Sequence, residues 1–319
     1  RASFLPGPGQ NMAQKIDRYT MHSVDLTKGA VLERGCVYIV PLLEQLSLSQ
    51  RLSAIANPKS STGRLDVFTR LITDGASEFD RIDAGYHGPL YAEIAPRTFS
   101  ILARTGARLN QMRLRRGEHR LTDSELTRLH QQSPLVHSDV GTENISEGIA
   151  LTVDLQGAGD NGLIGYNARP HAPLIDMEKI NHYDPVDFWE PIYAGTGTDS
   201  GLVLNPDDFY ILASREAVSV PPDHAAEMVA YDTLVGEFRV HYAGFFDPGF
   251  GWAEAGGEGT RAVLEVRSHD VPFLLEHGQT VGRLVYERLT DSPDRIYGQD
   301  IGSNYQKQTL ALAKQFRRG

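Results

Sequence analysis

Hydrophobic positions along the chain fall in short runs separated by glycine and proline. Four runs rich in β-branched and aromatic residues are CVYIVPLL (36–43), GLVLNPDDFYIL (201–212), RAVLEV (261–266) and TVGRLVYERL (280–289). Runs of about 4–8 such residues, bounded by turn-forming residues, are typical of β-strands. The pattern therefore predicts a mainly β protein.

One stretch between these runs has the pattern of a helix. In LTDSELTRLHQQSP (121–134), Thr122 is a suitable N-cap, and Glu125 three residues later completes a capping box. Leu126 and Leu129 share one helix face, and a proline ends the pattern. We therefore predict a helix here and a domain boundary near residue 120.

The segment that precedes this helix, RTGARLNQMRLRRGEHR (104–120), is rich in arginine. It can be read as a phosphate-binding patch. A solvated strand end followed by a linker accounts for the same composition, and we favour this second interpretation.

Two parts of the chain resemble each other at a constant spacing of 172 residues. The pairs of segments at this spacing are 38–55 with 210–227 and 92–109 with 264–281. Between these blocks, IDAGYHG (82–88) aligns with FDPGFG (246–251) at a shorter spacing. Glu44 aligns with Glu216, and Glu93 aligns with Glu265. We therefore predict two tandem copies of one β-rich unit, over residues 1–120 and 121–319.

Composition and charge exclude several classes of partner. The net charge of −10 gives no overall attraction to nucleic acid or anionic lipid. No apolar run approaches the roughly 20 residues that span a bilayer. The single cysteine, Cys36, excludes an intrachain disulfide and a cysteine-based zinc cluster, and we expect a buried structural thiol. We expect a cytoplasmic protein, with further residues upstream of Arg1.

Several common catalytic motifs are missing from the sequence. No glycine-rich loop is followed by GK[ST], GTGTDSG (195–201) lacks the spacing of a dinucleotide fingerprint, and there is no GxSxG. None of the 11 histidines lies in HExxH, or in an HxE step that precedes PCxxC. The signature of the zinc nucleobase deaminases is therefore absent.

The first candidate site is the polar segment NPKSSTGRLD (57–66). A turn-forming Asn-Pro leads into Lys59, Ser60 and Ser61, and Arg64 follows after a glycine. Hydroxyl and backbone N–H groups can surround phosphate oxygens, and arginine adds a planar, bidentate charge. The segment is a candidate phosphate loop, and a polar surface turn is the alternative.

The second candidate is FDRIDAGYHGPLYAEIAP (79–96). A tight turn joins two extended arms, which predicts a hairpin with Asp83 near its start and Glu93 on the return arm. The strand period of two places Tyr91 on the face of Glu93. Burial would raise the pKa of a carboxyl in such a strand, so that it could accept and donate a proton. A half-exposed edge-strand glutamate is the alternative, although Glu265 in the second copy favours a shared role.

These motifs, SSTGR, then IDAGYHG, then the strand with Glu93, resemble the dCTP deaminase branch of the trimeric dUTPase superfamily. The second copy is similar in its opening helix and in TVDL (152–155), FDPGFG, VLE (263–265) and YGQDIGSNYQKQ (297–308), which resembles a C-terminal lid. The resemblance covers most of the chain and points to a duplicated form. It implies two tandem dUTPase-like units, each a distorted barrel of mainly antiparallel strands with a few short helices, in a trimer-type homo-oligomer.

The resemblance implies hydrolytic deamination of dCTP to dUTP and ammonia without zinc, which would feed thymidylate synthesis. The catalytic residues that it implies are Glu93 as proton shuttle, Ser60 and Arg64 beside the attacking water, and Glu265 as the alternative shuttle. The substrate-binding residues that it implies, with Mg²⁺ on the triphosphate, are Lys59, Ser61, Asp83, Tyr91, Asp247, Tyr297, Tyr305 and Gln308.

The second copy departs from the family pattern. It has AYDTLVG (230–236) in place of the phosphate loop, and Asn304 stands where the lid usually has lysine. We therefore favour Glu93, from the copy with the fuller motif set, and keep Glu265 open. A dUTP pyrophosphatase or a bifunctional enzyme that forms dUMP, with Asp83 activating water, is the second interpretation. A non-catalytic nucleotide-binding regulatory protein is the third.

Overall fold

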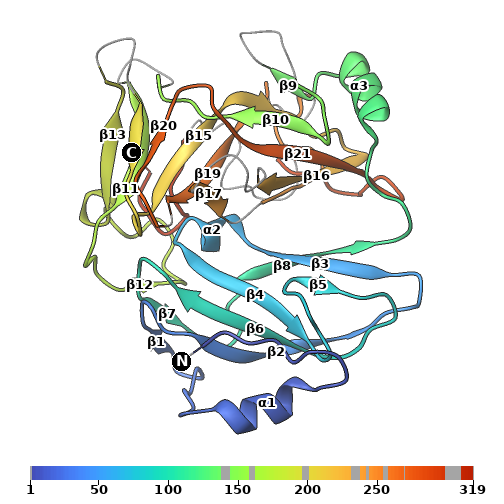
Figure 1. Cartoon of the computed structure of the whole chain (residues 1–319), viewed down its shortest axis with the longest axis vertical. Coiled ribbons are helices and arrows are strands. Elements are labelled where there is room, and N and C mark those ends of the chain that lie inside the picture. The colour runs from blue at the N-terminus through green and yellow to red at the C-terminus, as the bar shows by residue number, and fades with distance from the viewer. Residues whose placement is uncertain are drawn as a thin grey trace. The chain divides into compact units, whose positions relative to one another are not determined.

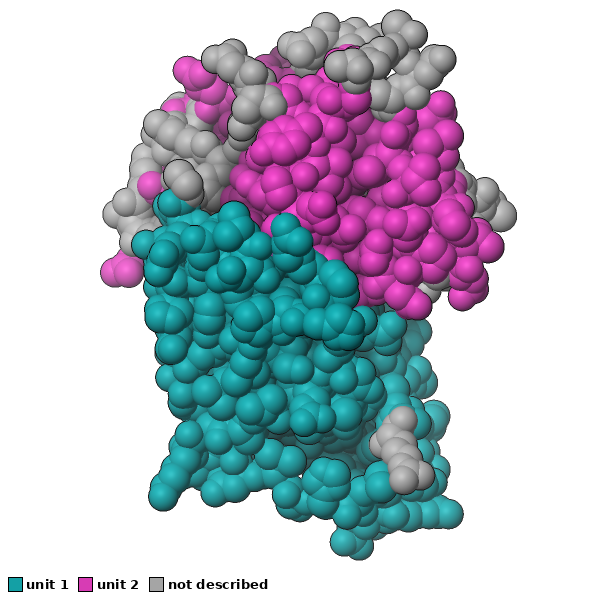
Figure 2. Space-filling view, turned by 90° about the vertical axis from the view of Figure 1, so that its left-hand side faces the viewer, with its two compact units in different colours: residues 1–118, 169–188, 313–319 teal, residues 119–168, 189–312 magenta. Residues whose placement is uncertain are grey.

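The computed structural model describes residues 2–137, 144–157, 162–195, 201–230, 238–241, 244–253, 258–268, 270–298 and 310–318. The chain divides into two compact units, which Figure 2 distinguishes by colour. Unit 1 contains residues 1–118, 169–188 and 313–319, and unit 2 contains residues 119–168 and 189–312. Strands dominate both units (Figure 1), which confirms the prediction of a mainly β protein. The closure of these strands into barrels stays a prediction.

Unit 1 contains three small sheets within its described residues. Their strand orders are β1-β7-β12, β2-β6-β4 and β5-β3-β8. The elements of this unit are α1 (Met12–Tyr19), β1 (Ala30–Leu32), β2 (Tyr38–Ser47), β3 (Ser53–Pro58), α2 (Ser60–Gly63), β4 (Val67–Thr73), β5 (Arg81–Ile82), β6 (His87–Pro96), β7 (Ile101–Ala103), β8 (Asn110–Arg115), β12 (Ile175–Asp176) and the 3₁₀ helix η1 (Pro185–Asp187). The central strand β6 is buried along most of its length, as its nearly continuous apolar sequence requires.

Unit 2 repeats this architecture with two larger sheets and one smaller sheet. Their strand orders, within the part of the chain that the structure describes, are β13-β11-β15-β19-β17, with β9 also on β15, then β10-β21-β16-β18, and β14-β20. The elements are α3 (Asp123–Gln132), β9 (Val136–His137), β10 (Ile149–Thr152), β11 (Leu163–Ala168), β13 (Trp189–Tyr193), β14 (Leu202–Leu204), β15 (Tyr210–Val218), β16 (His224–Ala230), β17 (Phe238–His241), β18 (Phe245–Phe246), β19 (Thr260–Ser268), β20 (Phe273–Leu275) and β21 (Thr280–Arg288).

Strand pairing repeats between the two units, with each residue number 172 higher in unit 2. Three pairs of unit 1 have such counterparts in unit 2. Ala30–Ala103 corresponds to Leu202–Leu275, Ile39–Glu93 corresponds to Ile211–Glu265, and Pro58–Asn110 corresponds to Ala230–Gly282. The register shift between Pro41 and Gln45 in β2 recurs between Ala213 and Ala217 in β15. The structure therefore confirms the tandem repeat and places Glu93 and Glu265 at equivalent strand positions.

The predicted helix is present as α3. The Thr122 side chain accepts the N–H of Glu125, and the Glu125 carboxylate accepts the N–H of Thr122, which forms the expected capping box. Leu126 is buried, and Leu129 packs against the core of unit 2. No helix in the described ranges is long and apolar enough to cross a bilayer.

Cys36 is exposed, so the expectation of a buried thiol is wrong. The residue lies in a turn between β1 and β2, where its N–H donates to the carbonyl oxygen of Glu33 (3.2 Å). The apolar run 36–43 therefore starts within this turn, and β2 begins two residues later, at Tyr38.

The hairpin predicted over residues 79–96 is only partly correct. Residues 84–85 form a turn, and β5 and β6 are the extended arms on either side of it. β5 pairs with β3, whereas β6 pairs with β2 and β4. The two arms therefore belong to different sheets, and the turn carries the chain from one sheet to the other.

Two segments from beyond residue 120 pack with unit 1 and not with the second domain in which the sequence placed them. β12 pairs in parallel with β7. Residues 313–318, here called the return segment, bond to residues 182 and 183: the N–H of His182 donates to Gln315 O and the N–H of Arg317 donates to Tyr183 O (both 2.8 Å). Phe316 is buried, so this segment contributes to the core of unit 1.

Candidate active site

The candidate phosphate loop forms a short helical turn, α2, directly after β3. The carbonyl oxygen of Lys59 accepts the N–H of Thr62 (2.7 Å), and the N–H of Lys59 donates to the carbonyl oxygen of Leu109 (2.8 Å). The Thr62 hydroxyl donates to the same carbonyl (3.0 Å). Ser61 and Arg64 are buried, so the segment is not the polar surface turn that was the alternative. The structure gathers four predicted residues on this turn: Lys59, Ser60, Ser61 and Arg64.

Glu93 is buried in β6 and forms an ion pair with its cross-strand neighbour Arg70. The Nε and Nη2 atoms of Arg70 donate to Oε1 of Glu93, at 3.1 and 2.5 Å. The guanidinium carbon lies 3.7 Å from the ring centroid of Phe79, and Nη2 also donates to the Ser3 hydroxyl (3.1 Å). The Glu93 carboxylate is therefore engaged in a buried ion pair across β4 and β6.

Tyr91 lies on the same face of β6 as Glu93 and belongs to the core. It is buried in a cluster with Met12 and Ile72, against which Phe4 and Leu5 pack. Burial raises the pKa of Tyr91, and the charge of Asp74 adds to this effect. The structure therefore gives Tyr91 a packing role beneath the N-terminal residues.

Glu265 occupies the equivalent position in β19 and is buried. It pairs in register with Ile211 of β15 and His241 of β17. His241 therefore stands opposite Glu265 at the backbone position that Arg70 occupies opposite Glu93.

The two predicted aspartates lie at equivalent turns, and both are exposed. The carbonyl oxygen of Asp83 accepts the N–H of Tyr86 (3.3 Å), and that of Asp247 accepts the N–H of Phe250 (3.0 Å). Tyr297 reaches the second turn, since its ring centroid lies 5.6 Å from that of Phe250. The structure thus brings Tyr297, the first residue of the predicted lid, to the turn that carries Asp247. Tyr305 and Gln308 lie outside the described residues.

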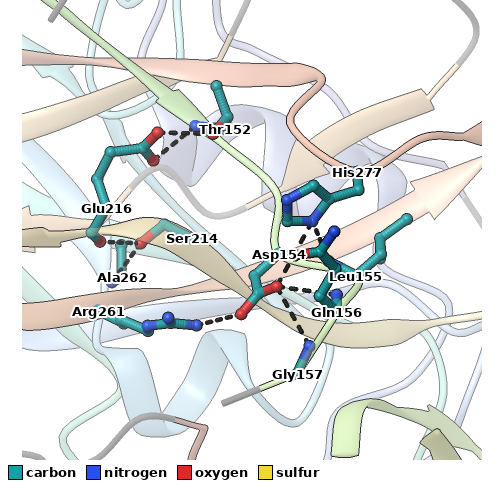
Figure 3. Close-up of polar contacts among 10 residues, drawn as sticks. All are labelled: Thr152, Asp154, Leu155, Gln156, Gly157, Ser214, Glu216, Arg261, Ala262 and His277. Carbon is teal, nitrogen blue, oxygen red and sulfur yellow. Dashed lines mark hydrogen bonds and ion pairs between the residues drawn. The ribbon is translucent and has the colours of Figure 1, made fainter. Parts of the chain in front are cut away.

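A polar cluster in unit 2 was not predicted from the sequence (Figure 3). Oδ1 of Asp154 accepts the N–H groups of Gln156 (2.9 Å) and Gly157 (3.2 Å), and Oδ2 accepts a hydrogen bond from Arg261. Burial acts to raise the pKa of Asp154, but the N–H of Gln156 and the guanidinium of Arg261 outweigh it, so the pKa is lowered. Asp154 is therefore an ionised anchor for Arg261.

The same cluster continues at the irregular part of β15. Glu216 accepts the N–H (2.8 Å) and the hydroxyl (2.6 Å) of Thr152, and the Ser214 hydroxyl accepts the N–H of Ala262 (2.9 Å). These bonds tie β10 to β15, and β15 to β19, the strand that carries Glu265 (Figure 3). The alignment of Glu216 with Glu44 was the signal for this cluster in the sequence.

Family models match nearly the whole chain. The model of the N-terminal domain of 2'-deoxycytidine 5'-triphosphate deaminase matches residues 1–118, and that of its C-terminal domain matches residues 122–316. A protein named "dCTP deaminase, dUMP-forming" from Halobacterium salinarum is 34% identical over 154 residues, which are 45% of this chain and 74% of the relative. A protein of the same name from Pseudarthrobacter chlorophenolicus is 30% identical over 140 residues, 42% of this chain and 70% of the relative.

A solved structure agrees with these matches over most of both chains. It is described as the crystal structure of 2'-deoxycytidine 5'-triphosphate deaminase from Agrobacterium tumefaciens, and it is 58% identical with a TM-score of 0.85. The match covers 92% of this chain and 85% of that chain. With both domain models matched and the same fold observed, the chain belongs to the 2'-deoxycytidine 5'-triphosphate deaminase family and is an enzyme.

Proposed function

We propose that this enzyme hydrolyses the C4 amino group of dCTP, which gives dUTP and ammonia, and that Glu265 is the proton shuttle. We choose between the two glutamates from one observation: the residues that lie opposite them in the sheets differ. Glu93 is held by Arg70, whereas a histidine stands opposite Glu265. Because the Glu93 carboxylate is already engaged in the ion pair with Arg70, we assign the contact with the cytosine ring to Glu265.

In the proposed reaction, water adds to C4 of the cytosine ring. The Glu265 carboxylate accepts a proton from this water and delivers it to ring N3. A second proton then passes through the carboxyl to the amine, the C4–N bond breaks, and ammonia leaves as the C4 carbonyl forms. Ser60 and Arg64 are proposed to hold phosphate oxygens and to orient the water.

The other proposed substrate contacts rest on the resemblance and, for the aspartate, also on the exposure of its side chain. The exposed carboxylate of Asp83 or of Asp247 would accept a hydrogen bond from the 3'-hydroxyl group of deoxyribose. The remaining proposed contacts are Lys59, Ser61, Tyr297, Tyr305 and Gln308. Mg²⁺ would accompany the triphosphate on its phosphate oxygens and on water, because Lys59 and Arg64 are cations and cannot bind it. We also propose a homo-oligomer, which sedimentation of the purified chain would detect.

The glutamate assignment is tested with two matched variants. Glu265→Gln should lower kcat for dCTP by about 10²–10⁴ while dCTP still binds, because the general acid–base group is lost. Glu93→Gln should lower the temperature of unfolding, because Arg70 loses its buried partner, and should change kcat by less than about tenfold. The reverse pattern would restore Glu93 as the shuttle, and normal turnover in both variants would exclude a glutamate shuttle.

The product is a separate question, because two relatives carry the words "dUMP-forming" in their names. Purified protein is incubated with dCTP and Mg²⁺, with and without a zinc chelator, and its nucleotides are separated by chromatography beside an ammonia assay. Equal amounts of dUTP and ammonia, unaffected by the chelator, support the proposal. dUMP and pyrophosphate would add a second hydrolysis, with Asp83 as the candidate to activate water. Binding of dCTP without any product would overturn the proposed reaction.

A further inference from the structure

The phosphate loop of unit 1, residues 59–66, joins β3 to β4, which belong to different sheets. At its first end, the Thr62 hydroxyl donates to the carbonyl oxygen of Leu109 (3.0 Å), directly before β8, which pairs with β3. At its second end, Oδ2 of Asp66 accepts a hydrogen bond from the Thr98 hydroxyl (2.5 Å), in the bend after β6, which pairs with β4. Each end of the loop is therefore bonded to the sheet from which it comes.

Asp66 has a costly position at the second end of the loop. It is fully buried, and its backbone has a left-handed conformation, with a φ of +54°. Burial removes water from its carboxyl group, and this conformation is strained for residues other than glycine. Its N–H donates to the carbonyl oxygen of Gly63 (2.8 Å), and its own carbonyl oxygen accepts the N–H of Arg97 (2.9 Å). Glycine could form the same backbone bonds without strain, so the turn by itself does not require the aspartate side chain.

Arg64 lies midway between the two bonded residues, Thr62 and Asp66. Its N–H donates to the carbonyl oxygen of Ser60 (3.0 Å), and its side chain is buried. Because the chain is held by a side chain two residues before Arg64 and again two residues after it, the backbone of Arg64 has little freedom. The direction of its guanidinium group is thus set before a ligand binds.

The second unit lacks both the loop and the hydroxyl that holds it. AYDTLVG (230–236) stands in place of the loop, and Asp270 is the residue 172 positions after Thr98. Position 270 therefore carries no threonine or serine hydroxyl. The hydroxyl is present in the unit that has the loop and missing from the unit that does not.

We propose that Asp66 and Thr98 are positioning residues, whose hydrogen bond holds the loop so that Arg64 and Ser60 meet the phosphates and the attacking water. This proposal rests on the proposed function, because it concerns the same loop. Neither Asp66 nor Thr98 contacts the nucleotide in it, and both act through Arg64. A displacement of a catalytic group by about 1 Å can lower a rate by about 100-fold, which sets the upper scale of the expected effects.

The first test compares two substitutions of Thr98 that differ in the hydroxyl. Thr98→Val keeps the shape of the side chain and removes the hydroxyl, whereas Thr98→Ser keeps the hydroxyl. Steady-state kinetics with dCTP and Mg²⁺ should show a KM raised about tenfold in Thr98→Val, with a lower kcat, because the loop is no longer held. Thr98→Ser should stay within about twofold of the wild type in both constants, because its hydroxyl can still donate. A wild-type KM in Thr98→Val would overturn the proposal.

Substitutions of Asp66 separate its side chain from its backbone. Glycine keeps the left-handed turn, so Asp66→Gly should lose only the bond to Thr98 and should raise KM about as much as Thr98→Val does. Asparagine also adopts this conformation, and its amide oxygen can accept from Thr98, so Asp66→Asn should stay within about threefold of the wild type. The double variant of Asp66→Gly and Thr98→Val should be no worse than either single variant. A normal KM in Asp66→Gly would show that the turn alone holds the loop.

A matched control separates positioning from stability. Thr122→Val removes another hydroxyl that donates to a carboxylate, that of Glu125 (2.9 Å) in α3 of unit 2. It should lower the unfolding temperature, because the capping box is lost, and it should leave the KM for dCTP unchanged. If Thr122→Val raised KM as much as Thr98→Val, KM would follow stability and the positioning role would be wrong.

The outcomes also distinguish this inference from the function on which it rests. If the wild type and Thr98→Val deaminate dCTP with the same KM and kcat, the positioning role is wrong and the function stands. If the wild type does not deaminate dCTP, calorimetry measures the Kd of dCTP with Mg²⁺ instead. A Kd raised in Thr98→Val but not in Thr98→Ser would then support the positioning role without the proposed function, and equal Kd values would overturn both.

Discussion

Asp80 lies beside the ion pair of Arg70 and Glu93 and is the acid of unit 1 whose protonation the structure alters most clearly. Its Oδ1 accepts the N–H of Leu71 (2.7 Å). Burial raises the pKa of Asp80 to about 7; the bond from Leu71 and the charge of Arg70 oppose this rise, and Glu93 adds to it. Asp80 therefore changes charge near neutral pH, far above the usual range of an aspartate.

This shift predicts a pH dependence of stability. The carboxyl of Asp80 titrates near pH 4 in the unfolded chain and near 7 in the folded one, so its contribution is fully present below about pH 4 and is lost as pH rises to about 7. Relative to Asp80→Asn, the wild type should lose roughly 1–3 kcal/mol of unfolding free energy between pH 5 and pH 8. Urea unfolding measures this difference.

The exposed Asp17 supplies the control for this experiment, as Asp17→Asn. The stability of this variant should follow that of the wild type across the same range of pH. Parallel curves for Asp80→Asn and the wild type would show that Asp80 does not titrate as the structure indicates.

For single residues, the sequence predicts which positions are important better than it predicts which side chains they contact. Glu93 and Glu265 could be found from the repeat, because each lies in an apolar strand at the same spacing. The ion pair between Arg70 and Glu93 could not be found, because it depends on the register of β4 against β6. Asp154 was seen only as part of a resembling segment, since Arg261 meets it from a distant strand.

At the scale of elements, the turns after β5 and β18 are equivalent but differ in their surroundings. Gly85 and Gly249 have φ values of +78° and +90°. A Cβ at Gly85 would meet the flexible side chain of Gln50, at 2.3 Å or more. A Cβ at Gly249 would lie 2.9 Å from Cβ of Ile296 and 3.0 Å from the carbonyl oxygen of Tyr297. The second turn therefore packs directly on the chain that leads into the predicted lid.

Gly249→Ala should destabilise the protein more than its counterpart Gly85→Ala. Both variants place a side chain at positive φ, which costs about 1 kcal/mol, but only the first must also displace the chain at Tyr297. We expect a total loss of about 2–3 kcal/mol for Gly249→Ala, together with a raised KM for dCTP. Thermal unfolding and steady-state kinetics measure both effects. Equal losses in the two variants would show that the lid segment does not rest on this turn.

The elements that could be predicted are those with a strong local signal. The capping box at Thr122 identified α3, and the repeated apolar runs identified the strands. α1 was missed, although Asn11 caps it, because only Met12 in this eight-residue helix is buried. The pairing of β5 with β3 was also missed, since a tight turn alone does not show whether its two arms pair with each other.

At the scale of the whole molecule, unit 1 is built from three separate parts of the chain. The sequence predicts a boundary near residue 120 but gives no sign that residues 169–188 and the return segment join the first unit. The contacts that hold these two segments in unit 1 involve few residues, so they leave no clear pattern in the sequence. Phe316 is followed by two arginines and a glycine, so its surroundings look like those of an exposed end. Its burial depends on Tyr183 and Phe188, which lie far away in the sequence.

Phe316→Ala should therefore destabilise unit 1 strongly. The Phe316 ring is 2% exposed and its centroid lies 5.2 Å from that of Phe188. Removal of a buried phenylalanine typically costs about 3–5 kcal/mol. Calorimetry should show the transition of unit 1 at a lower temperature. Met21→Ala, which truncates a side chain that is 60% exposed in the same unit, should leave that transition in place. An unchanged transition in Phe316→Ala would mean that the return segment adds nothing to unit 1.

The return segment also sets the order in which the protein can be completed during synthesis. Chains leave the ribosome from their N-terminus, so residues 119–168 and 189–312 have all emerged before Phe316 does. Unit 1, although it is translated first, must wait with part of its core open until unit 2 has been made. A chain whose translation stops early would therefore display an unfinished first unit, and proteases could remove it before it reached an assembled enzyme.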